Sequence, residues 1–125
     1  MDYKKLNSKT VKDNYPLPII DDLLRDLAKA NYFSKMDLES GYYCIAMDPS
    51  SSKYTAFLCE FGLFEWTRLP MGLTNSGATF QRAMTKLFKD QIGKFLYIYV
   101  DDFIVFSKTA AEHTEHLKQV IDILK

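Results

Sequence analysis

The 125-residue sequence lacks several features that define common protein classes. It has only two cysteines, Cys44 and Cys59, and no CxxC pair, which favours reduced thiols in an intracellular protein over a disulfide. No apolar run approaches the ~20 residues that span a bilayer, so we expect no membrane partner. The polar start MDYKKLNSKT is not that of a signal peptide. The net charge is zero, so it gives no indication of nucleic-acid binding by itself.

The composition and the distribution of charge are more informative. A hydrophobic content of 47% and an aromatic content of 14% indicate a packed core, and the length predicts a single domain. An acidic stretch, 13–48, lies between two basic stretches, 1–12 and 81–94. This pattern would suit a metal site flanked by phosphate-binding surface. Ordinary scatter of surface charge explains it equally well.

Hydrophobic periodicity predicts an α+β fold with a small, largely antiparallel sheet and helices packed on one face. Helical spacing marks three segments, and alternating or β-branched residues mark the strands. The helices are expected at 18–29, from Thr74 to a stop at Gly93, and from the capping-box pattern at Thr109 to Leu124. The strands are expected at 31–38, 44–48, 96–100 and 103–107, with a hairpin over 54–69 that turns near Gly62.

Two adjacent aspartates, Asp101 and Asp102, interrupt the apolar stretch LYIYVDDFIVF. Two solvated turn residues are the simplest explanation, but the flanking strands are too apolar to be mostly exposed. Asp37 also ends an apolar strand and would complete a set of three carboxylates if the strands are neighbours. Such a set would repel unless a divalent cation lay between its members, and oxygen ligands favour Mg²⁺ or Mn²⁺. Two such ions would serve phosphoryl or nucleotidyl transfer.

His113 and His116 are the other candidate metal ligands, because they lie at helical spacing beside Glu112 and Glu115. We expect them to be exposed polar positions of an amphipathic helix, since nothing else supports a zinc site.

Four motifs resemble those of one family, in the correct order and over nearly the whole chain. YVDD (Tyr99–Asp102) resembles the signature of reverse transcriptases, and MDLESGYYCIAM (Met36–Met47) resembles their first metal-binding motif. The segment Thr55–Met84 is similar to the region between those motifs in gypsy-like long-terminal-repeat retrotransposons. DYKKLNSKT with YPLPIIDDLL resembles the segment that leads into the palm of these enzymes.

The resemblance implies a polymerase palm with part of the fingers. Its activity would be metal-dependent transfer of deoxynucleotides from dNTPs onto a DNA primer, on an RNA or DNA template, with two Mg²⁺ or Mn²⁺ ions. It assigns catalysis to Asp37, Asp101 and Asp102, and metal binding to these residues and the Leu38 carbonyl. It assigns nucleotide binding to Gly41, Tyr42, Met71 and Gly72, with Tyr42 excluding ribonucleotides. It assigns template and primer contacts to Tyr99, Val100, Gln81 and Arg82.

The chain departs from the family pattern at Tyr43-Cys44, where His-Gln is common, and at Asn75–Gly77, where Asn-Ala-Pro is usual. Neither departure removes a metal ligand. We expect a partial domain, 1–125, without the upstream fingers, the thumb or the RNase H domain, so the isolated chain should show no sustained primer extension. The remainder of a retrotransposon polyprotein is then a partner, and the location is intracellular and cytoplasmic, including virus-like particles. The alternatives are a non-catalytic remnant and another two-metal phosphoryl-transfer enzyme.

Overall fold

The computed structural model describes residues 1–125, which form two compact units. The first unit consists of Met1–Asn14 and Glu39–Phe80, and the second unit consists of Tyr15–Leu38 and Gln81–Lys125. None of the helices combines the length and the apolar character that crossing a membrane requires.

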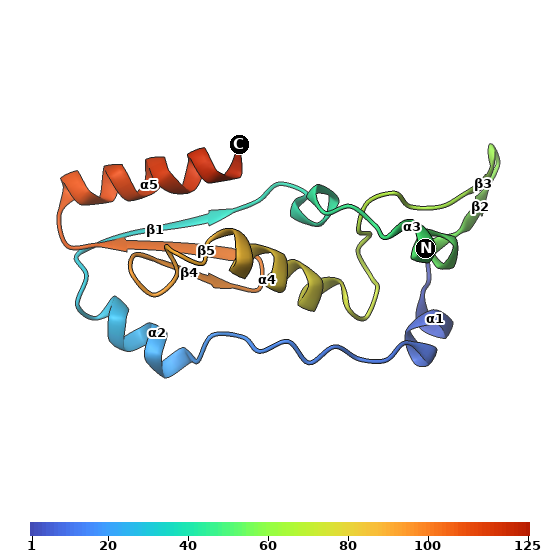
Figure 1. Ribbon diagram of the computed structural model, residues 1–125, viewed down its shortest axis with the longest axis horizontal. Helices are drawn as coiled ribbons and strands as arrows, with labels where there is room; N and C mark the ends of the chain where they lie inside the picture. The colour runs from blue at the N-terminus through green and yellow to red at the C-terminus, as the bar shows by residue number, and fades with distance from the viewer. The chain divides into compact units, whose positions relative to one another are not determined.

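The second unit is built on a three-stranded antiparallel sheet (Figure 1). The order across the sheet is β1 (Tyr32–Asp37), β5 (Asp102–Ser107) and β4 (Leu96–Tyr99). Central β5 pairs with a strand on each side, and its Phe103 and Val105 are fully buried. The antiparallel sheet expected from the sequence is confirmed, with strands close to the expected positions.

One face of this sheet is covered by helical segments. Phe103 points to this face and packs edge-on against Phe88, which follows α4 (Ser76–Leu87). α5 (Ala110–Leu124) contacts β5 and β1. Its expected cap is confirmed, because the Thr109 side chain accepts a hydrogen bond from the N–H of Glu112 at 3.2 Å.

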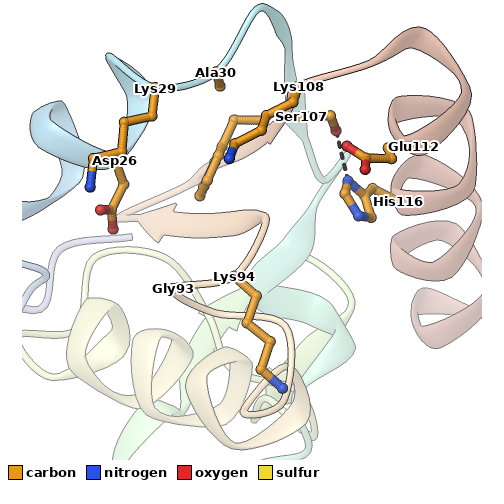
Figure 2. Close-up of a pocket in the computed structure, with 10 residues that line it drawn as sticks. Asp26, Lys29, Ala30, Gly93, Lys94, Ser107, Lys108, Glu112 and His116 are labelled. Atoms are coloured by element: carbon orange, nitrogen blue, oxygen red, sulfur yellow. Dashed lines mark hydrogen bonds between the residues drawn. The ribbon is translucent and has the colours of Figure 1, made fainter.

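The two histidines attach α5 to the sheet, which corrects the expectation that they are exposed. His113 lies between the hydroxyl groups of Ser34 in β1 and Ser107 in β5, at 2.7 and 2.9 Å. His116 Nδ1 lies 2.7 Å from the same Ser107 hydroxyl, beside a pocket of about 420 Å³ (Figure 2). Burial lowers the pKa of His116 and favours its neutral form. Periodicity alone missed this role because the polar partners come from strands distant in sequence.

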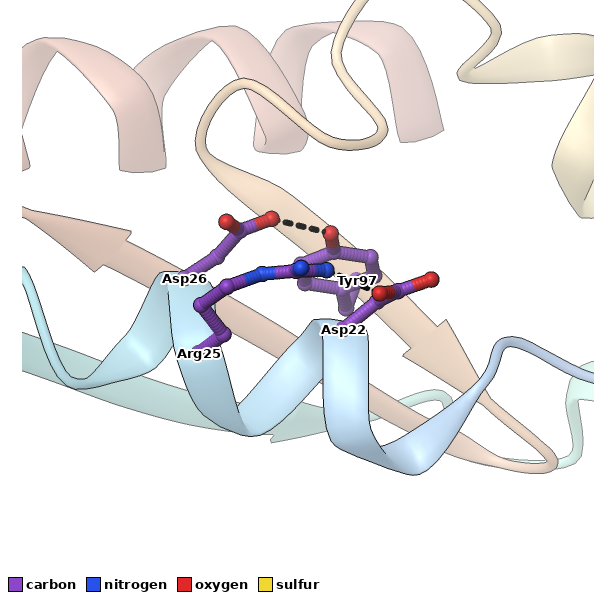
Figure 3. Close-up of polar contacts among 4 residues, drawn as sticks. All are labelled: Asp22, Arg25, Asp26 and Tyr97. Atoms are coloured by element: carbon purple, nitrogen blue, oxygen red, sulfur yellow. Dashed lines mark hydrogen bonds and ion pairs between the residues drawn. The ribbon is translucent and has the colours of Figure 1, made fainter.

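α2 (Ile20–Leu27) packs against the opposite face of the sheet from α5 (Figure 1). Its buried Leu23 forms a hydrophobic cluster with Tyr97 of β4 and Phe106 of β5. The Tyr97 hydroxyl donates a hydrogen bond of 2.5 Å to the Asp26 carboxylate of α2 (Figure 3). A hydrophobic cluster and one charged hydrogen bond therefore hold this helix on the sheet.

The first unit contains only short elements. The hairpin expected near Gly62 is confirmed, and Gly62 has a φ of +126°, a backbone conformation that favours glycine. The elements in chain order are α1 (Lys4–Lys9), the 3₁₀ helix η1 (Gly41–Cys44), α3 (Pro49–Ser52), the 3₁₀ helix η2 (Lys53–Thr55), β2 (Phe57–Cys59) and β3 (Gly62–Phe64).

Two expectations about local structure are wrong. The strand expected over 44–48 is not formed, because η1 ends at Cys44 and only the single bridge Ala46–Arg68 follows. α4 ends at Leu87 rather than near Gly93, and Gly93 instead lies in the turn before β4 with a φ of +84°. Helices α1 and α3 were not expected from the sequence.

The Tyr97–Asp26 contact predicts a pH-dependent part of the stability. The hydrogen bond to Asp26, together with burial, raises the pKa of Tyr97 from 10.0 to about 12. Because the pKa is higher in the folded chain, this stabilisation is complete below pH 10 and is lost as the pH rises through 12. Tyr97→Phe should lower the free energy of unfolding by about 1–2 kcal/mol at pH 7, and by less above pH 10. Urea unfolding at several pH values measures both effects.

Tyr32→Phe in β1 is the control, because no hydrogen bond involves the Tyr32 hydroxyl, and its effect should be small at every pH. A Tyr97→Phe effect that stays constant up to pH 11.5 would contradict the prediction.

Candidate active site

The adjacent aspartates lie at the end of the β4–β5 hairpin. Tyr99 is the cross-strand partner of Asp102, so the two linking residues are Val100 and Asp101, and Asp102 begins β5. The two-residue turn therefore lies one residue earlier than the Asp101–Asp102 turn expected from the sequence. Asp101 is exposed and Asp102 is half-buried.

Val100 has an unusual backbone conformation. Its φ is +57°, whereas Asp101 has a negative φ, and these signs match a type II′ turn. Glycine usually occupies the first central position of such a turn, and a β-branched residue there is strained. Strain of this kind persists only where the surrounding structure enforces it, and it is concentrated at functional sites. The turn residues therefore mark a candidate site on geometry alone.

Strand pairing brings Asp37 next to the turn. Asp37 ends β1 and is the direct cross-strand partner of Asp102. Side chains of such partners lie on the same face, with Cβ atoms about 4.5–5.5 Å apart. Leu38, whose carbonyl was proposed as a further ligand, follows directly. The backbone thus brings together the residues that the sequence assigned to one site.

The three carboxylates are not gathered around a common point. No group of three or more Asp, Glu, His or Cys side chains in residues 1–125 is arranged to hold a metal ion. The Asp102 carboxylate instead lies 3.1 Å from Nζ of Lys35 in β1. The oxygen donors of Asp37, Asp101 and Asp102 suit a hard divalent cation, and the metal site stays a prediction.

The two residues expected to face the template have other contacts. Gln81 is 3% exposed, and its Nε2 donates a hydrogen bond of 2.9 Å to the carbonyl of Ile98 in β4. Gln81 therefore holds the edge of β4 two residues before Val100, and its contact with template stays a prediction. The Arg82 guanidinium lies 4.7 Å from the centre of the Tyr15 ring, a cation–π arrangement.

The predicted nucleotide-binding residues belong to the first unit. Gly41 and Tyr42 lie in η1, and the Tyr42 ring packs against Phe80 at a centroid distance of 5.1 Å. Met71 is exposed, and Gly72 has a φ of +92° and accepts a hydrogen bond from the Asn7 amide. These contacts hold η1 and the 71–72 turn within their unit, and the nucleotide-binding role stays a prediction.

Lys35 is the charged neighbour of the aspartates that sequence reasoning missed. A signal was present, because residues two apart in a strand point to the same face and Lys35 precedes Asp37 by two. The pairing of β1 with β5 was needed to identify Asp102 as the partner of Lys35.

Comparisons with known proteins agree with the fold. The family described as "Reverse transcriptase (RNA-dependent DNA polymerase)" matches residues 1–125. The chain is 42% identical over 124 residues to the Pol polyprotein of transposon gypsy from Drosophila melanogaster, covering 99% of the chain and 12% of the polyprotein. It is 37% identical over 123 residues to an RNA-directed DNA polymerase homolog from Oenothera berteroana, covering 96% of the chain and 87% of that homolog.

Solved structures of reverse transcriptases have a similar fold. The foamy viral protease-reverse transcriptase in complex with an RNA/DNA hybrid superposes with a TM-score of 0.84 at 32% identity, over 98% of the chain and 16% of that protein. Its complex with double-stranded DNA gives a TM-score of 0.85 at 32% identity, over 98% and 21%. The fold is thus that of solved reverse transcriptases. The chain belongs to the reverse transcriptase family.

The strained turn predicts an unusual response to glycine. Val100→Gly should leave the free energy of unfolding unchanged or raise it by up to about 1 kcal/mol, because relief of strain offsets the greater entropy of the unfolded chain. Val105→Gly in β5 is the matched control and should lower it by several kcal/mol, since Val105 is fully buried. Urea unfolding of both variants tests this. A clear loss of stability in Val100→Gly would show that the turn is not strained.

Proposed function

We propose that residues 1–125 are the core of an RNA-directed DNA polymerase that transfers deoxynucleotides onto a DNA primer. The observation that carries the proposal is the pairing of Asp37 with Asp102, next to the strained turn that presents Asp101. The chain spans 12% of the gypsy polyprotein, so the activity of a whole polymerase is proposed for this sequence together with flanking regions. The other segments of a retrotransposon polyprotein are proposed as partners, and the location is proposed to be intracellular.

The reaction requires an in-line displacement at phosphorus. The 3′-hydroxyl oxygen of the primer bonds to the α-phosphorus of a dNTP, the bond to the bridging oxygen breaks, and pyrophosphate leaves with the hydroxyl proton released to solvent. Enzymes of this family generally use divalent metal ions, and two Mg²⁺ or Mn²⁺ ions would activate the hydroxyl and stabilise the leaving group. Asp37 and Asp101 would hold them, assisted by Asp102 and the Leu38 carbonyl.

The remaining residues would position the substrates. Tyr99 and Val100, at the end of β4, would contact the primer terminus, and an RNA or DNA template would pass nearby. Support comes from the foamy viral enzyme of similar fold, which was solved with an RNA/DNA hybrid. Gly41, Tyr42, Met71 and Gly72 would form the pocket for the incoming nucleotide.

The first test replaces the matched segment of the gypsy Pol reverse transcriptase with residues 1–125 and follows primer extension. Asp101→Asn should lower kcat at least about 100-fold, because metal stabilisation of the transition state contributes several kcal/mol and each 1.36 kcal/mol is tenfold in rate. Asp90→Asn makes the same chemical change at an exposed site after α4 and should have little effect. A folded but inactive parent chimaera would identify a non-catalytic remnant, and an Asp101-independent activity would refute the site.

The second test concerns sugar selection in the same chimaera. Tyr42→Ala should improve the use of ribonucleotides relative to deoxynucleotides about tenfold or more, because the ring would no longer block a 2′-hydroxyl. Tyr43→Ala is the matched control, since the adjacent Tyr43 ring stacks on Trp66 at 5.4 Å. Unchanged discrimination in Tyr42→Ala would make Tyr42 a packing residue of η1.

A further inference from the structure

Lys35 shares one face of the sheet with two of the three aspartates. In the β1–β5 register, Asp37 lies opposite Asp102 and Lys35 lies opposite Ile104. Residues two apart in a strand point to the same side, so Lys35, Asp37 and Asp102 project from a single face. The β1 strand thus places one cation and one anion beside the Asp102 carboxylate.

Lys35 is bound to only one of the aspartates. Its Nζ lies 3.1 Å from Oδ2 of Asp102, a diagonal contact across the two strands. No ion pair involves Asp37 or Asp101. Since the Lys35 and Asp102 side chains are 67% and 41% exposed, the pair contributes little to stability. Its main effect falls on the charge and the direction of the Asp102 carboxylate.

We propose that Lys35 is a positioning residue that decides which carboxylates are available to divalent cations. It neutralises Asp102 and holds its carboxylate along β1, which leaves Asp37 and Asp101 as the two unpaired acids at the turn. The proposal rests on the proposed function, because it concerns the same metal site. The proposal assigns unequal roles to the two adjacent aspartates, because the ion pair with Lys35 holds Asp102 while Asp101 stays available to a cation.

The proposal predicts that loss of Lys35 strengthens metal binding. In Lys35→Met the side chain keeps its length but loses its charge, so Asp102 becomes free to join the metal ligands. Mn²⁺ should then bind the 125-residue chain about two- to tenfold more tightly at 0.1 M salt, as screened Coulomb energies of nearby charges indicate. Isothermal titration calorimetry with Mn²⁺ alone measures the dissociation constant. Lys35→Arg keeps the charge and should resemble the wild type.

A double-mutant cycle separates positioning from a simple loss of charge. If Lys35 acts only as a nearby charge, Asp102→Asn weakens Mn²⁺ binding by the same factor with and without Lys35. If Lys35 holds Asp102 away from the ion, the factor is larger in Lys35→Met, where Asp102 is a direct ligand. Equal factors would overturn the proposal. Lys108→Met removes an exposed charge just beyond the other end of β5 and should leave Mn²⁺ binding unchanged.

The two proposals fail in different ways. Mn²⁺ binding that is equal in wild type and Lys35→Met overturns the role of Lys35 alone. Absence of Mn²⁺ binding in both overturns the metal site and the role of Lys35 together. Far-UV circular dichroism checks the fold of each variant, and Lys35→Gln is the second charge-free variant if Lys35→Met does not fold.

Discussion

The pairing of β1 with β5 is the constraint on which the second unit depends. It joins residues about seventy apart in sequence, and it alone makes Asp37 the neighbour of Asp102. Because strand side chains alternate, a shift of one residue would move Asp37 to the other face and bring Ser34 away from His113. The same register therefore determines the aspartate site at one end of the sheet and the attachment of α5 at the other. The apolar residues of β5, buried between the helices on either face, make this register strongly specified.

The sequence predicted those parts of the fold whose signals are local. Alternation and β-branched residues revealed β1, β4 and β5, and Thr109 with Glu112 revealed the start of α5. Short elements were less predictable, because they depend on individual contacts. α3, for example, begins where the Asp48 side chain accepts a hydrogen bond from the N–H of Ser50, with Pro49 at the first helical position. Four residues are too few to show a helical period.

For the candidate site, spacing and resemblance were sufficient to select Asp37, Asp101 and Asp102 but not their surroundings. The contact of Lys35 with Asp102 and the burial of Gln81 depend on which strands are neighbours. This strand pairing cannot be read directly from a single sequence. The strain at Val100 was also inaccessible, since valine is typical of a strand and only the closed hairpin reveals its positive φ. The residues of the candidate site could thus be selected from the sequence, whereas their contacts could be identified only from the pairing of the strands.

The Ser107 hydroxyl, which lies between His113 and His116, has only one proton to give. If it donates to one Nδ1, the other Nδ1 must carry a hydrogen and donate to the Ser107 oxygen. The choice at His113 also decides whether its Nε2 accepts from Ser34 or donates to it. The four side chains therefore form a directional chain with two opposite neutral settings, in which the tautomer of one imidazole dictates that of the other.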